Sequence, residues 1–513
     1  MGALAPATRG VAAETMITSL AAVAVAFHLS ISSQPLQSAR VLASCAAGLL
    51  AFLFCARLAR LDGTAVRAGW IGLAAAGTLL AVHGLWQSLA GFERLAAEAG
   101  LPEAVRTRLA SGRAVATLGV PGALAGFFAL SLPITAALAW RARASRGAAF
   151  AAGAAAVLQA AALIATRSVA APLSLALAAA LVAWCRAPST ARRRLAIVSL
   201  AGGGAIAAAL TLWRLASYTV ATEGAGPLVL RAGNWRAALA MVADRPLFGG
   251  GLGCFGILFP AYRDWTMNES RFAHNTWLQL AAEAGVPAAL AAGALAIWLA
   301  WRLVRRDGRL EPAAPAAAIA CVGFLIHNGV DFTFYLPSVA LPFFCLAGFE
   351  VGRGRRGMPH GDARAARLIA CAALAVFALL LARADAQRDA AREAAAAGSS
   401  VAIEAARAAV RLDPIDPESH DLLSRLLLAR AAASQEAGLL SEAEAHAARA
   451  VDLDDRTPGH WNQLGRVRLA RADRQGAYIA LHRAAELYPI QLEYRQDRDA
   501  VAAMLAGSGE RAR

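Results

Sequence analysis

The chain alternates between long apolar runs, dominated by Ala, Leu and Val, and short polar intervals rich in arginine. An α-helix rises 1.5 Å per residue, so a segment that crosses a bilayer needs about 20 apolar residues. This rule predicts eleven membrane spans, near residues 12–31, 40–56, 68–90, 119–140, 147–165, 169–185, 195–217, 275–301, 313–330, 335–351 and 366–383. We expect the first to be a retained helix and not a cleaved signal peptide, because its basic flank is weak.

Composition agrees with a membrane protein. The apolar fraction is 58% and the mean hydropathy is +0.49, above the usual share in soluble domains. A net charge of +15 would also suit a nucleic-acid binder. Most arginines, however, stand in short clusters between apolar spans, so we predict the membrane as a partner and no nucleic acid. The seven cysteines show no CxxC or Cys/His spacing, which argues against structural zinc and disulfides.

The arginine clusters predict an orientation. Cytoplasmic loops of membrane proteins carry an excess of Lys and Arg. Five arginine-rich loops alternate strictly along the chain and fall on one predicted side, which must then be cytoplasmic. They contain Arg57/Arg60/Arg67, Arg141/Arg143/Arg146, Arg186/Arg192/Arg193/Arg194, Arg302/Arg305/Arg306/Arg309 and Arg353/Arg355/Arg356/Arg364/Arg367. The opposite side receives the 91–118 loop, the turn at 166–168, the large 218–274 loop, the turn at 328–337 and everything after residue 382.

The last 130 residues have a different pattern, helical and amphipathic, with charges of both signs. We therefore predict a membrane domain over 1–383 and a soluble domain over 384–513. The spacing of Trp461, Leu464, Gly465, Ala477, Leu481, Ala484 and Pro489 matches a tetratricopeptide repeat. A plain helical hairpin domain is the alternative. The predicted fold class is thus all-α, a polytopic helical bundle followed by a helical-repeat domain that offers a surface to a protein partner.

Candidate chemistry gathers in the polar stretch from Arg231 to Gly285. Its central residue is His274, at the predicted boundary between membrane and water. A neutral imidazole accepts a proton near neutral pH, so His274 is the natural general base of the chain. A lone histidine is more often a capping or interfacial residue, but the flanking RFAHN and a polar stripe favour the base. That stripe is Asn275, Gln279 and Glu283 at i, i+4, i+8 of the span predicted at 275–301.

Arginines on the same predicted side suit phosphate oxygens, because a guanidinium donates two parallel hydrogen bonds. They are Arg167 in a short turn, Arg231 at the entry of the large loop, and Arg245, Arg263 and Arg271 within it. The alternative is a solvated charge paired with Asp244, Asp264 or Glu269, an interpretation we prefer for Arg263. The glycine run at 249–253 lacks a GK[ST] ending and a strand-helix unit, so we exclude nucleotide binding.

A second polar group is HNGVDF, in which His327 and Asp331 stand four residues apart. That spacing suits a metal, but two ligands do not make a metal site. We expect the pair to support the cavity, and we expect no cofactor.

These residues carry a resemblance to a known family. RPLFGGGLGCFGILFPAY followed by AHN…LQLAAEAG resembles the O-antigen ligase and O-antigen polymerase superfamily of bacterial membrane glycosyltransferases. LGVPGALAGFFALSLPI (118–134), the turn at 166–168 and HNGVDFTFYLP are also similar. The resemblance covers the chain to about residue 350. It departs from the family at Gly122, where Asn is usual, and at Arg167-Ser168, where the order is usually Ser-Arg.

The resemblance implies a GT-C-like helical fold in the bacterial inner membrane and an undecaprenyl-diphosphate-linked glycan as donor. His274 would deprotonate the acceptor hydroxyl, and arginines would neutralise the leaving diphosphate without a metal. The predicted substrate-binding residues are Arg167, Arg231, Arg245, Tyr262, Arg271, Asn275 and Gln279, with Glu283, His327 and Asp331 in support.

Two questions stay open on the sequence. The acceptor is lipid A-core, a growing glycan or a protein hydroxyl, so ligase, polymerase and protein O-oligosaccharyltransferase are all compatible. A transporter of lipid-linked glycans is the rival from another class. A transporter needs a midplane site between repeated halves, whereas the candidate residues here crowd one predicted membrane face.

Overall fold

A computed structural model describes residues 27–61, 63–96, 109–186, 189–218, 227–263, 270–305, 314–353, 383, 386–396, 401–434 and 437–507. The chain forms two compact units. The membrane unit contains residues 41–239 and 272–359; the tail unit contains residues 1–40, 240–271 and 360–513. The predicted span at 366–383 and most of the one at 12–31 lie outside the described residues.

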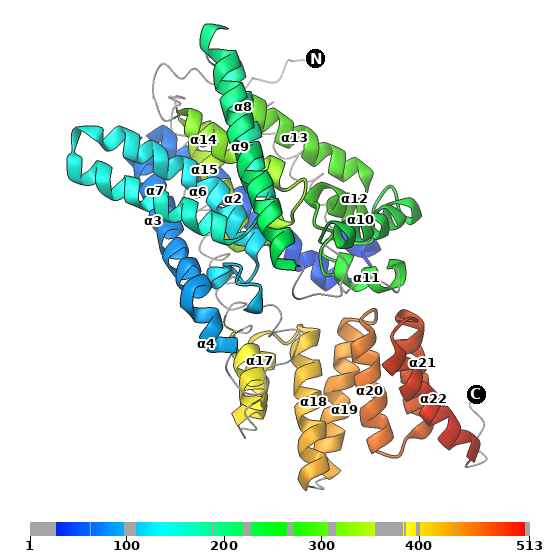
Figure 1. Cartoon of the computed structure of the whole chain (residues 1–513). Coiled ribbons are helices and arrows are strands. Elements are labelled where there is room, and N and C mark those ends of the chain that lie inside the picture. The colour runs from blue at the N-terminus through cyan, green and yellow to red at the C-terminus, as the bar shows by residue number, and fades with distance from the viewer. Residues whose placement is uncertain are drawn as a thin grey trace, which may run out of the picture. The chain divides into compact units, whose positions relative to one another are not determined.

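The regular structure of the described residues is helical, as predicted (Figure 1). The longer helices of the membrane unit are α2 (Pro35–Leu61, whose first turns belong to the tail unit), α3 (Gly63–Trp86), α6 (Pro121–Arg141), α7 (Arg146–Ala165), α8 (Ala170–Arg186), α9 (Ser189–Tyr218), α10 (Pro227–Asp244, whose last residues belong to the tail unit), α13 (Val286–Arg305), α14 (Ala314–His327) and α15 (Pro337–Gly352). Shorter elements are η1 (Gln87–Gly91), α4 (Phe92–Ala96), η2 (Ala116–Leu118), η3 (Ala142–Ala144), α12 (Thr276–Ala284) and η5 (Thr333–Tyr335).

Six helices within the described residues are long and apolar enough to cross a membrane. They cover Gln37–Leu61, Gly63–Leu95, Pro121–Ala144, Arg146–Ala165, Ala191–Leu212 and Val286–Arg305. Three more apolar helices are shorter, namely Ala170–Arg186, Pro315–His327 and Pro337–Gly352. The chain is therefore a multi-pass membrane protein by its helices, while the predicted number of eleven spans is not confirmed.

The span predicted at 275–301 is wrong in one respect, because two helices replace it. α12 ends at Ala284, Gly285 has φ +87°, and α13 starts at Val286. Glycine takes a positive φ at little cost, and Pro287 suits the first turn of a new helix. The polar stripe therefore lies on α12 alone and does not continue into the spanning helix. The large loop predicted at 218–274 also contains helix, in α10 and in α11 (Phe255–Tyr262).

Arginines at the ends of several helices contact the ends of neighbouring helices. Arg186, at the end of α8, donates to the carbonyls of Leu303 and Val304, at the end of α13. Arg353, just after α15, lies over the ring of Trp70 near the start of α3, 5.1 Å from its centroid. Helices bearing arginine at these ends thus meet there. We call this the arginine end of the membrane unit.

Small residues bring the spans of this unit together. A Cβ added at Gly348 or Gly352 would collide with the α2 backbone at Phe52 or Ala56, the close approach that small residues permit in membranes. Deeper in the bundle, Gln159 of α7 is buried and its side chain reaches two other helices, α3 and α6. It donates to the Ala74 carbonyl at 3.1 Å and to the Thr135 hydroxyl at 3.0 Å, and it accepts from Ser131 at 2.9 Å. Each polar atom is satisfied inside the bundle, as a low dielectric demands.

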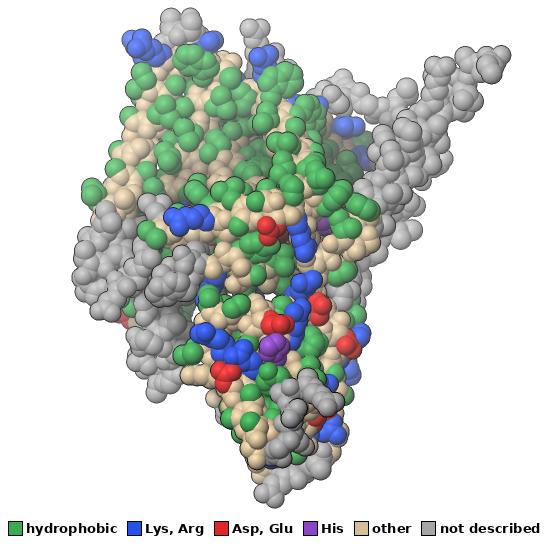
Figure 2. All heavy atoms as spheres, turned by 90° about the vertical axis from the view of Figure 1, so that its right-hand side faces the viewer, with side chains coloured by type: hydrophobic (Ala, Val, Ile, Leu, Met, Phe, Trp, Pro, Cys, Tyr) green, Lys and Arg blue, Asp and Glu red, His purple; other side chains and the backbone are tan. Residues whose placement is uncertain are grey.

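In the tail unit, α17 (Val401–Leu412), α18 (Pro417–Ser434), α19 (Ala437–Leu453), α20 (Pro458–Ala470), α21 (Arg474–Leu487) and α22 (Leu492–Gly507) pack in chain order (Figure 1). Ala477, Leu481 and Ala484 are buried, and a Cβ at Gly465 would come within 2.6 Å of Leu481. These residues stand at positions predicted for the repeat, and they pack α20 against α21. The tetratricopeptide assignment stays a prediction. Charges of both signs gather on the tail unit in Figure 2, whereas apolar side chains dominate the membrane unit there.

Turns of the repeat helices contact the other two segments of the tail unit. Arg40 pairs with Asp413 at 2.7 Å and Asp416 at 3.2 Å, between α17 and α18. Gln34 donates to Asp454, between α19 and α20, at 2.7 Å. Arg263 lies over the ring of Tyr488, 4.9 Å from its centroid. The start of α2, the segment after α11 and the tail helices are thus joined in one unit.

Candidate active site

Two loops of the membrane unit are joined through Thr276 and Asn328. The first loop (270–275) precedes α12, and the second (328–336) connects α14 to α15. The Thr276 N–H donates to the carbonyls of Asn328 at 2.9 Å and Asp331 at 3.0 Å, and its hydroxyl donates to Asn328 Oδ1 at 2.8 Å. Asn328 Oδ1 also accepts from the Thr333 hydroxyl and the Phe334 N–H, at 3.1 and 3.0 Å. One buried amide oxygen therefore serves three donors and fixes both loops.

His274 lies on the first loop in a left-handed backbone conformation, with φ +56°. Such a conformation costs a non-glycine residue of the order of 1–3 kcal/mol and persists only where neighbours hold it. On one side Asn275 caps α12, accepting from the N–H groups of Trp277 and Leu278 at 3.1 and 3.0 Å. On the other side the Ala273 N–H donates to Gln279 Oε1 at 3.0 Å. Both neighbours of His274 are thus fixed by α12.

The His274 ring is partly buried and packs edge-on against Phe332, with centroids 4.8 Å apart. Phe332 in turn stacks on Phe272 at 4.1 Å. Burial lowers the pKa of His274; the Asp331 carboxylate opposes this shift, and the Arg231 charge adds to it. The ring is therefore neutral at neutral pH. Its Nδ1 is buried and makes no hydrogen bond with the described residues. A neutral imidazole can accept a proton from a hydroxyl near neutral pH.

Arg231 lies on α10, in a stretch that the sequence pattern presented as a loop, and its charge lowers the pKa of His274. One turn further along α10, Asn234 Nδ2 approaches the Phe272 carbonyl at 3.5 Å. This contact sets α10 against the first loop, two residues before His274. The role of Arg231 stays a prediction; the helix that carries it, α10, was not predicted from the sequence.

The predicted polar stripe is a buried chain of hydrogen bonds. Gln279 Nε2 donates to Glu283 Oε1 at 3.0 Å, and the Tyr335 hydroxyl donates to Glu283 Oε2 at 2.8 Å. Burial, with the Glu283 charge, holds the pKa of Tyr335 well above its usual value. The stripe therefore ties α12 to η5, between α14 and α15. Asn275 and Gln279 form hydrogen bonds within the protein that hold the backbone on both sides of His274; their predicted contact with substrate stays a prediction.

His327 and Asp331 form the other side of the site. His327 ends α14, and its Nε2 lies 3.6 Å from Asp331 Oδ2, although Asp331 is in the following loop and not on the helix. Both side chains are buried. A Cβ added at Gly122, in the first turn of α6, would collide with the Asp331 carboxylate. The glycine at this position, where the resembling family usually has Asn, therefore makes room for Asp331.

Arg167 lies in the turn between α7 and α8, also with positive φ, +53°. Neighbouring backbone fixes this turn: the Ala114 N–H donates to the Ala165 carbonyl at 3.0 Å, and Arg113 Nε donates to the Thr166 carbonyl at 2.9 Å. Arg113 was not among the predicted residues. Its only sequence signal is its place at the end of the predicted 91–118 outer loop.

Three predicted residues belong to the tail unit. Arg245 donates to the Ser33 hydroxyl at 2.9 Å, and the Tyr262 hydroxyl donates to Asp244 at 2.7 Å. Burial and this bond to Asp244 raise the pKa of Tyr262. Arg271 is exposed, and its backbone packs against Gly256 of α11. Arg263, expected to pair with an acidic residue, lies over Tyr488; Asp264 and Glu269 lie outside the described residues.

The glycine run forms turns that pack closely against the segment before α2 within the tail unit. Gly249, Gly251 and Gly253 all have positive φ. A side chain at Gly251 would collide with the Ser32 hydroxyl, and the Gly250 carbonyl accepts from the Ser33 N–H at 3.0 Å. The loop thus wraps closely around the segment before α2.

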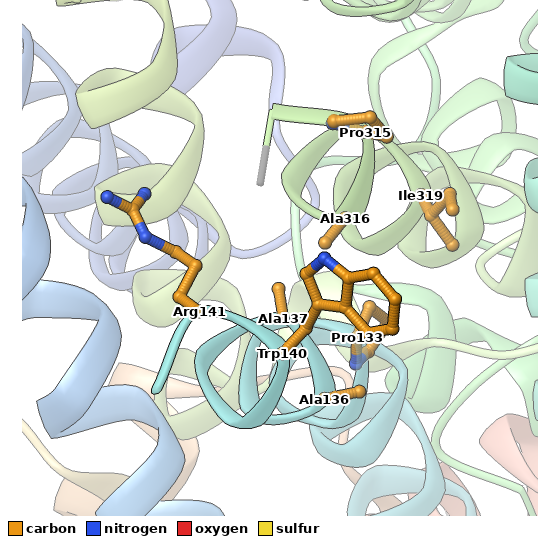
Figure 3. Close-up of a pocket in the computed structure, with 8 residues that line it drawn as sticks. All are labelled: Pro133, Ala136, Ala137, Trp140, Arg141, Pro315, Ala316 and Ile319. Atoms are coloured by element: carbon orange, nitrogen blue, oxygen red, sulfur yellow. The ribbon is translucent and has the colours of Figure 1, made fainter. Parts of the chain in front are cut away.

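A cavity of about 330 Å³ opens elsewhere in the membrane unit, between the end of α6 and the start of α14 (Figure 3). Pro133, Ala136, Ala137 and Trp140 line it from α6, and Pro315, Ala316 and Ile319 from α14, while Arg141 extends away from Trp140. Gly122 and His327 occupy the opposite ends of the same two helices. This cavity is therefore not the site of His274.

Comparison with known proteins supports one class. The apolar helices define a multi-pass membrane protein, and residues 154–293 match the family described as O-antigen ligase. The matched stretch runs from α7 into α13, so it includes Arg167, Arg231 and His274 but not His327 or Asp331. The match supports the O-antigen ligase superfamily and a glycosyltransferase function of that kind. No curated protein matches the chain.

Proposed function

We propose that the chain is a membrane glycosyltransferase of the O-antigen ligase type. It transfers a polyprenyl-diphosphate-linked glycan to an acceptor hydroxyl on the periplasmic face of the inner membrane, without a metal. The observation that carries this proposal is His274: a neutral, partly buried imidazole within reach of the Arg231 charge, in the stretch that matches the family.

In this reaction His274 accepts the proton of the acceptor hydroxyl. The oxygen forms a bond to the anomeric carbon as the bond from that carbon to the diphosphate oxygen breaks. The lipid diphosphate leaves with the bonding electron pair, and cationic groups aimed at this developing charge lower the barrier. We assign that role to Arg231, and to Arg167 where the lipid headgroup reaches the α7–α8 turn. Asn275 and Gln279 hold His274, and Asp331 tunes it.

The proposed periplasmic side rests on the arginine bias and on the tail unit. A repeat domain joined to the glycine-rich loop is suited to bring a protein partner or acceptor to the loop. Polymerase and protein O-oligosaccharyltransferase activities use the same site with another acceptor. The transporter alternative has less support, because its candidate residues would have to lie near the midplane, whereas His274, Asn328 and Asp331 lie in loops at helix ends.

The test is an in-membrane transfer assay with extracted lipid-linked glycan as donor and envelope fractions as acceptor. Wild type is compared with His274→Ala and with His482→Ala, a matched control at a half-exposed tail histidine. We expect transfer to vanish only in His274→Ala, at equal insertion. Product size then separates a ligase from a polymerase. Normal transfer by His274→Ala would show that His274 is not the general base. If no protein transfers glycan but lipid-linked glycan still moves from one membrane face to the other, the transporter hypothesis is supported.

A further inference from the structure

Two histidines of the tail unit are hydrogen-bonded to each other. His420 lies in the first turn of α18 and His446 lies in α19, and the two helices pack side by side (Figure 1). The Nδ1 atoms of the two rings are 2.8 Å apart, and the ring centroids are 5.1 Å apart. His420 is buried and His446 is partly buried. The pair belongs to the tail unit and has no part in the proposed transfer reaction.

The Pro414 carbonyl determines which ring atoms carry the protons. It lies 3.1 Å from His420 Nε2, and a carbonyl oxygen only accepts, so His420 donates from Nε2. A neutral imidazole carries a single N–H, which leaves His420 Nδ1 as an acceptor. His446 must then donate from its own Nδ1. The hydrogen bond between the rings therefore runs in one direction, from α19 to α18.

This hydrogen bond tolerates one added proton but not two. A proton on His446 Nε2 leaves the donor and the acceptor of the bond unchanged. A second proton, on His420 Nδ1, places one N–H group against another across the same 2.8 Å, and the two positive rings repel each other. Protonation of both histidines therefore breaks the contact between them.

Both rings are neutral at neutral pH. Among the described residues, the charged groups that act on them come from α17, α19 and the turn between α17 and α18, and they are Arg407, Asp413, Asp416, Glu442 and Arg449. Burial lowers the pKa of His420, although the bond to the Pro414 carbonyl opposes this shift. Burial also lowers the pKa of His446, and the neighbouring His420 adds to the shift. The hydrogen bond between the rings is therefore intact at neutral pH.

The turn that His420 closes also holds the start of α2. Pro414, which accepts from His420, stands between Asp413 and Asp416 in the α17–α18 turn. Arg40 pairs with Asp413 at 2.7 Å and with Asp416 at 3.2 Å. A change at His420 thus reaches the turn through one hydrogen bond, and the turn reaches α2 through two ion pairs.

Another buried histidine of the tail unit responds to pH in the opposite direction. His460, in α20, lies 3.2 Å from Asp421 and 4.0 Å from Asp454. Burial lowers its pKa, but the two carboxylates outweigh burial, and the pKa is raised above 6.5. The contribution of His460 to stability is therefore present below pH 6.5 and is lost as the pH rises through the raised pKa. Loss of packing in acid cannot come from His460.

We propose that the His420–His446 pair is a pH-sensitive joint that holds α18 to α19 and closes the turn that binds Arg40, and that it opens when both rings are protonated. The closed joint binds fewer protons than the open one, because the pKa values of both rings are lowered in it. Its contribution is present above the ordinary histidine pKa of 6.5 and is lost as the pH falls toward the lowered values. Acid thus loosens the hold of the tail helices on the start of α2.

The test is hydrogen exchange of the purified full chain in detergent, at about pH 7.5 and about pH 5, a range in which histidines change charge. Rates are corrected for the intrinsic dependence of exchange on pH. Peptides over residues 34–40 and 409–420 report on the start of α2 and on the turn. Melting at the higher pH shows whether each variant is folded.

Four variants are compared with wild type. His446→Asn keeps an amide donor near the position of Nδ1 but does not titrate, and His420→Asn provides the same comparison with an amide acceptor if His446→Asn is unfolded. His482→Asn is a matched control at a half-exposed histidine. Arg40→Gln removes the ion pairs to the turn and leaves the histidines in place.

We expect both peptides of wild type and of His482→Asn to exchange about tenfold to a hundredfold faster at the lower pH, since each pKa lowered by one unit contributes tenfold. His446→Asn should show little response to pH. Arg40→Gln should exchange faster over 34–40 at both pH values, while 409–420 still responds to acid.

Two results would overturn the proposal. If wild type shows no response to acid, or His446→Asn responds as strongly as wild type, the pair is not a pH-sensitive joint. If 409–420 responds to acid while 34–40 stays unchanged in wild type, the joint does not control the hold on α2.

Discussion

The two ends of the membrane unit hold their polar residues in different ways. At the end that carries His274, which we call the histidine end, Asn328 and Thr276 are buried and form hydrogen bonds with fixed partners. At the arginine end, Arg305 and Trp301 are exposed and stacked on each other. Buried polar groups are costly unless every partner is in place, so the first arrangement specifies one geometry. The second tolerates change, because water and headgroups can replace a lost contact.

This difference indicates where on the fold a catalytic residue can be held in one geometry. A strained residue such as His274 needs neighbours that hold its backbone, and the hydrogen-bonded loops provide them. The stacked arginines at the other end need no such fixed loop. The two ends should therefore respond differently to substitution, and that expectation is testable.

The largest expected effect comes from removing the amide that joins the loops. Asn328→Ala leaves three buried donors without their acceptor, each worth about 1–3 kcal/mol when unsatisfied. We expect a large loss of thermal stability and of transfer together. Arg305→Ala at the other end should change neither strongly. A melting temperature of Asn328→Ala equal to wild type contradicts the fixed-loop account.

The next effect concerns the leaving group. Arg231→Gln should lower the maximal rate of transfer about a hundredfold, the usual result of losing one group that stabilises developing charge. Stability should change little, because Arg231 is only partly buried. Initial rates at saturating donor measure this, with Arg236→Gln, an exposed residue of the same helix, as control. Equal losses in both variants would remove the specific role of Arg231.

A third effect tests the space beside Asp331. Gly122→Ala places a methyl group against the Asp331 carboxylate, which should displace it and reduce both stability and transfer by a moderate amount. Gly147→Ala, at the start of α7 on the arginine end, meets no atom within 4 Å and should be neutral or slightly stabilising. The melting temperatures of the two variants test this prediction. An unchanged melting temperature in Gly122→Ala would contradict the close packing of Gly122 against Asp331.

The smallest effect is a shift in pH dependence. His274 must be neutral to act as a base, so activity is lost as pH falls through its pKa, which burial places below the ordinary value of 6.5. Arg231→Gln removes a charge that lowers this pKa and should move the acidic limb to higher pH. Asp331→Asn removes a charge that raises it and should move the limb to lower pH. Shifts in the same direction would contradict the assignment.

The sequence allowed the apolar helices to be predicted, because apolar length is a local signal. A polar cluster at a helix start is also local, and it made His274 the candidate base. It did not reveal the break at Gly285, since Asn275, Gln279 and Glu283 keep helical spacing up to that glycine. Nor did it show α10, whose polar residues read as loop.

The contact between the two loops could not be predicted from the sequence for another reason. Thr276 and Asn328 are 52 residues apart, and a contact of that range depends on how the helices between them pack. The same holds for Gly122 and Asp331. The polar cluster HNGVDF after an apolar helix was the available signal, and it was interpreted as a supporting pair.

The most direct test of the central claim is the transfer rate of His274→Asn in reconstituted membranes. Asn adopts the left-handed backbone more readily than most residues, so this change keeps the loop while removing the base. The account predicts a rate about 10²–10⁴-fold below wild type, with unchanged melting temperature and insertion. A rate close to wild type, at equal insertion, would show that His274 is not the general base.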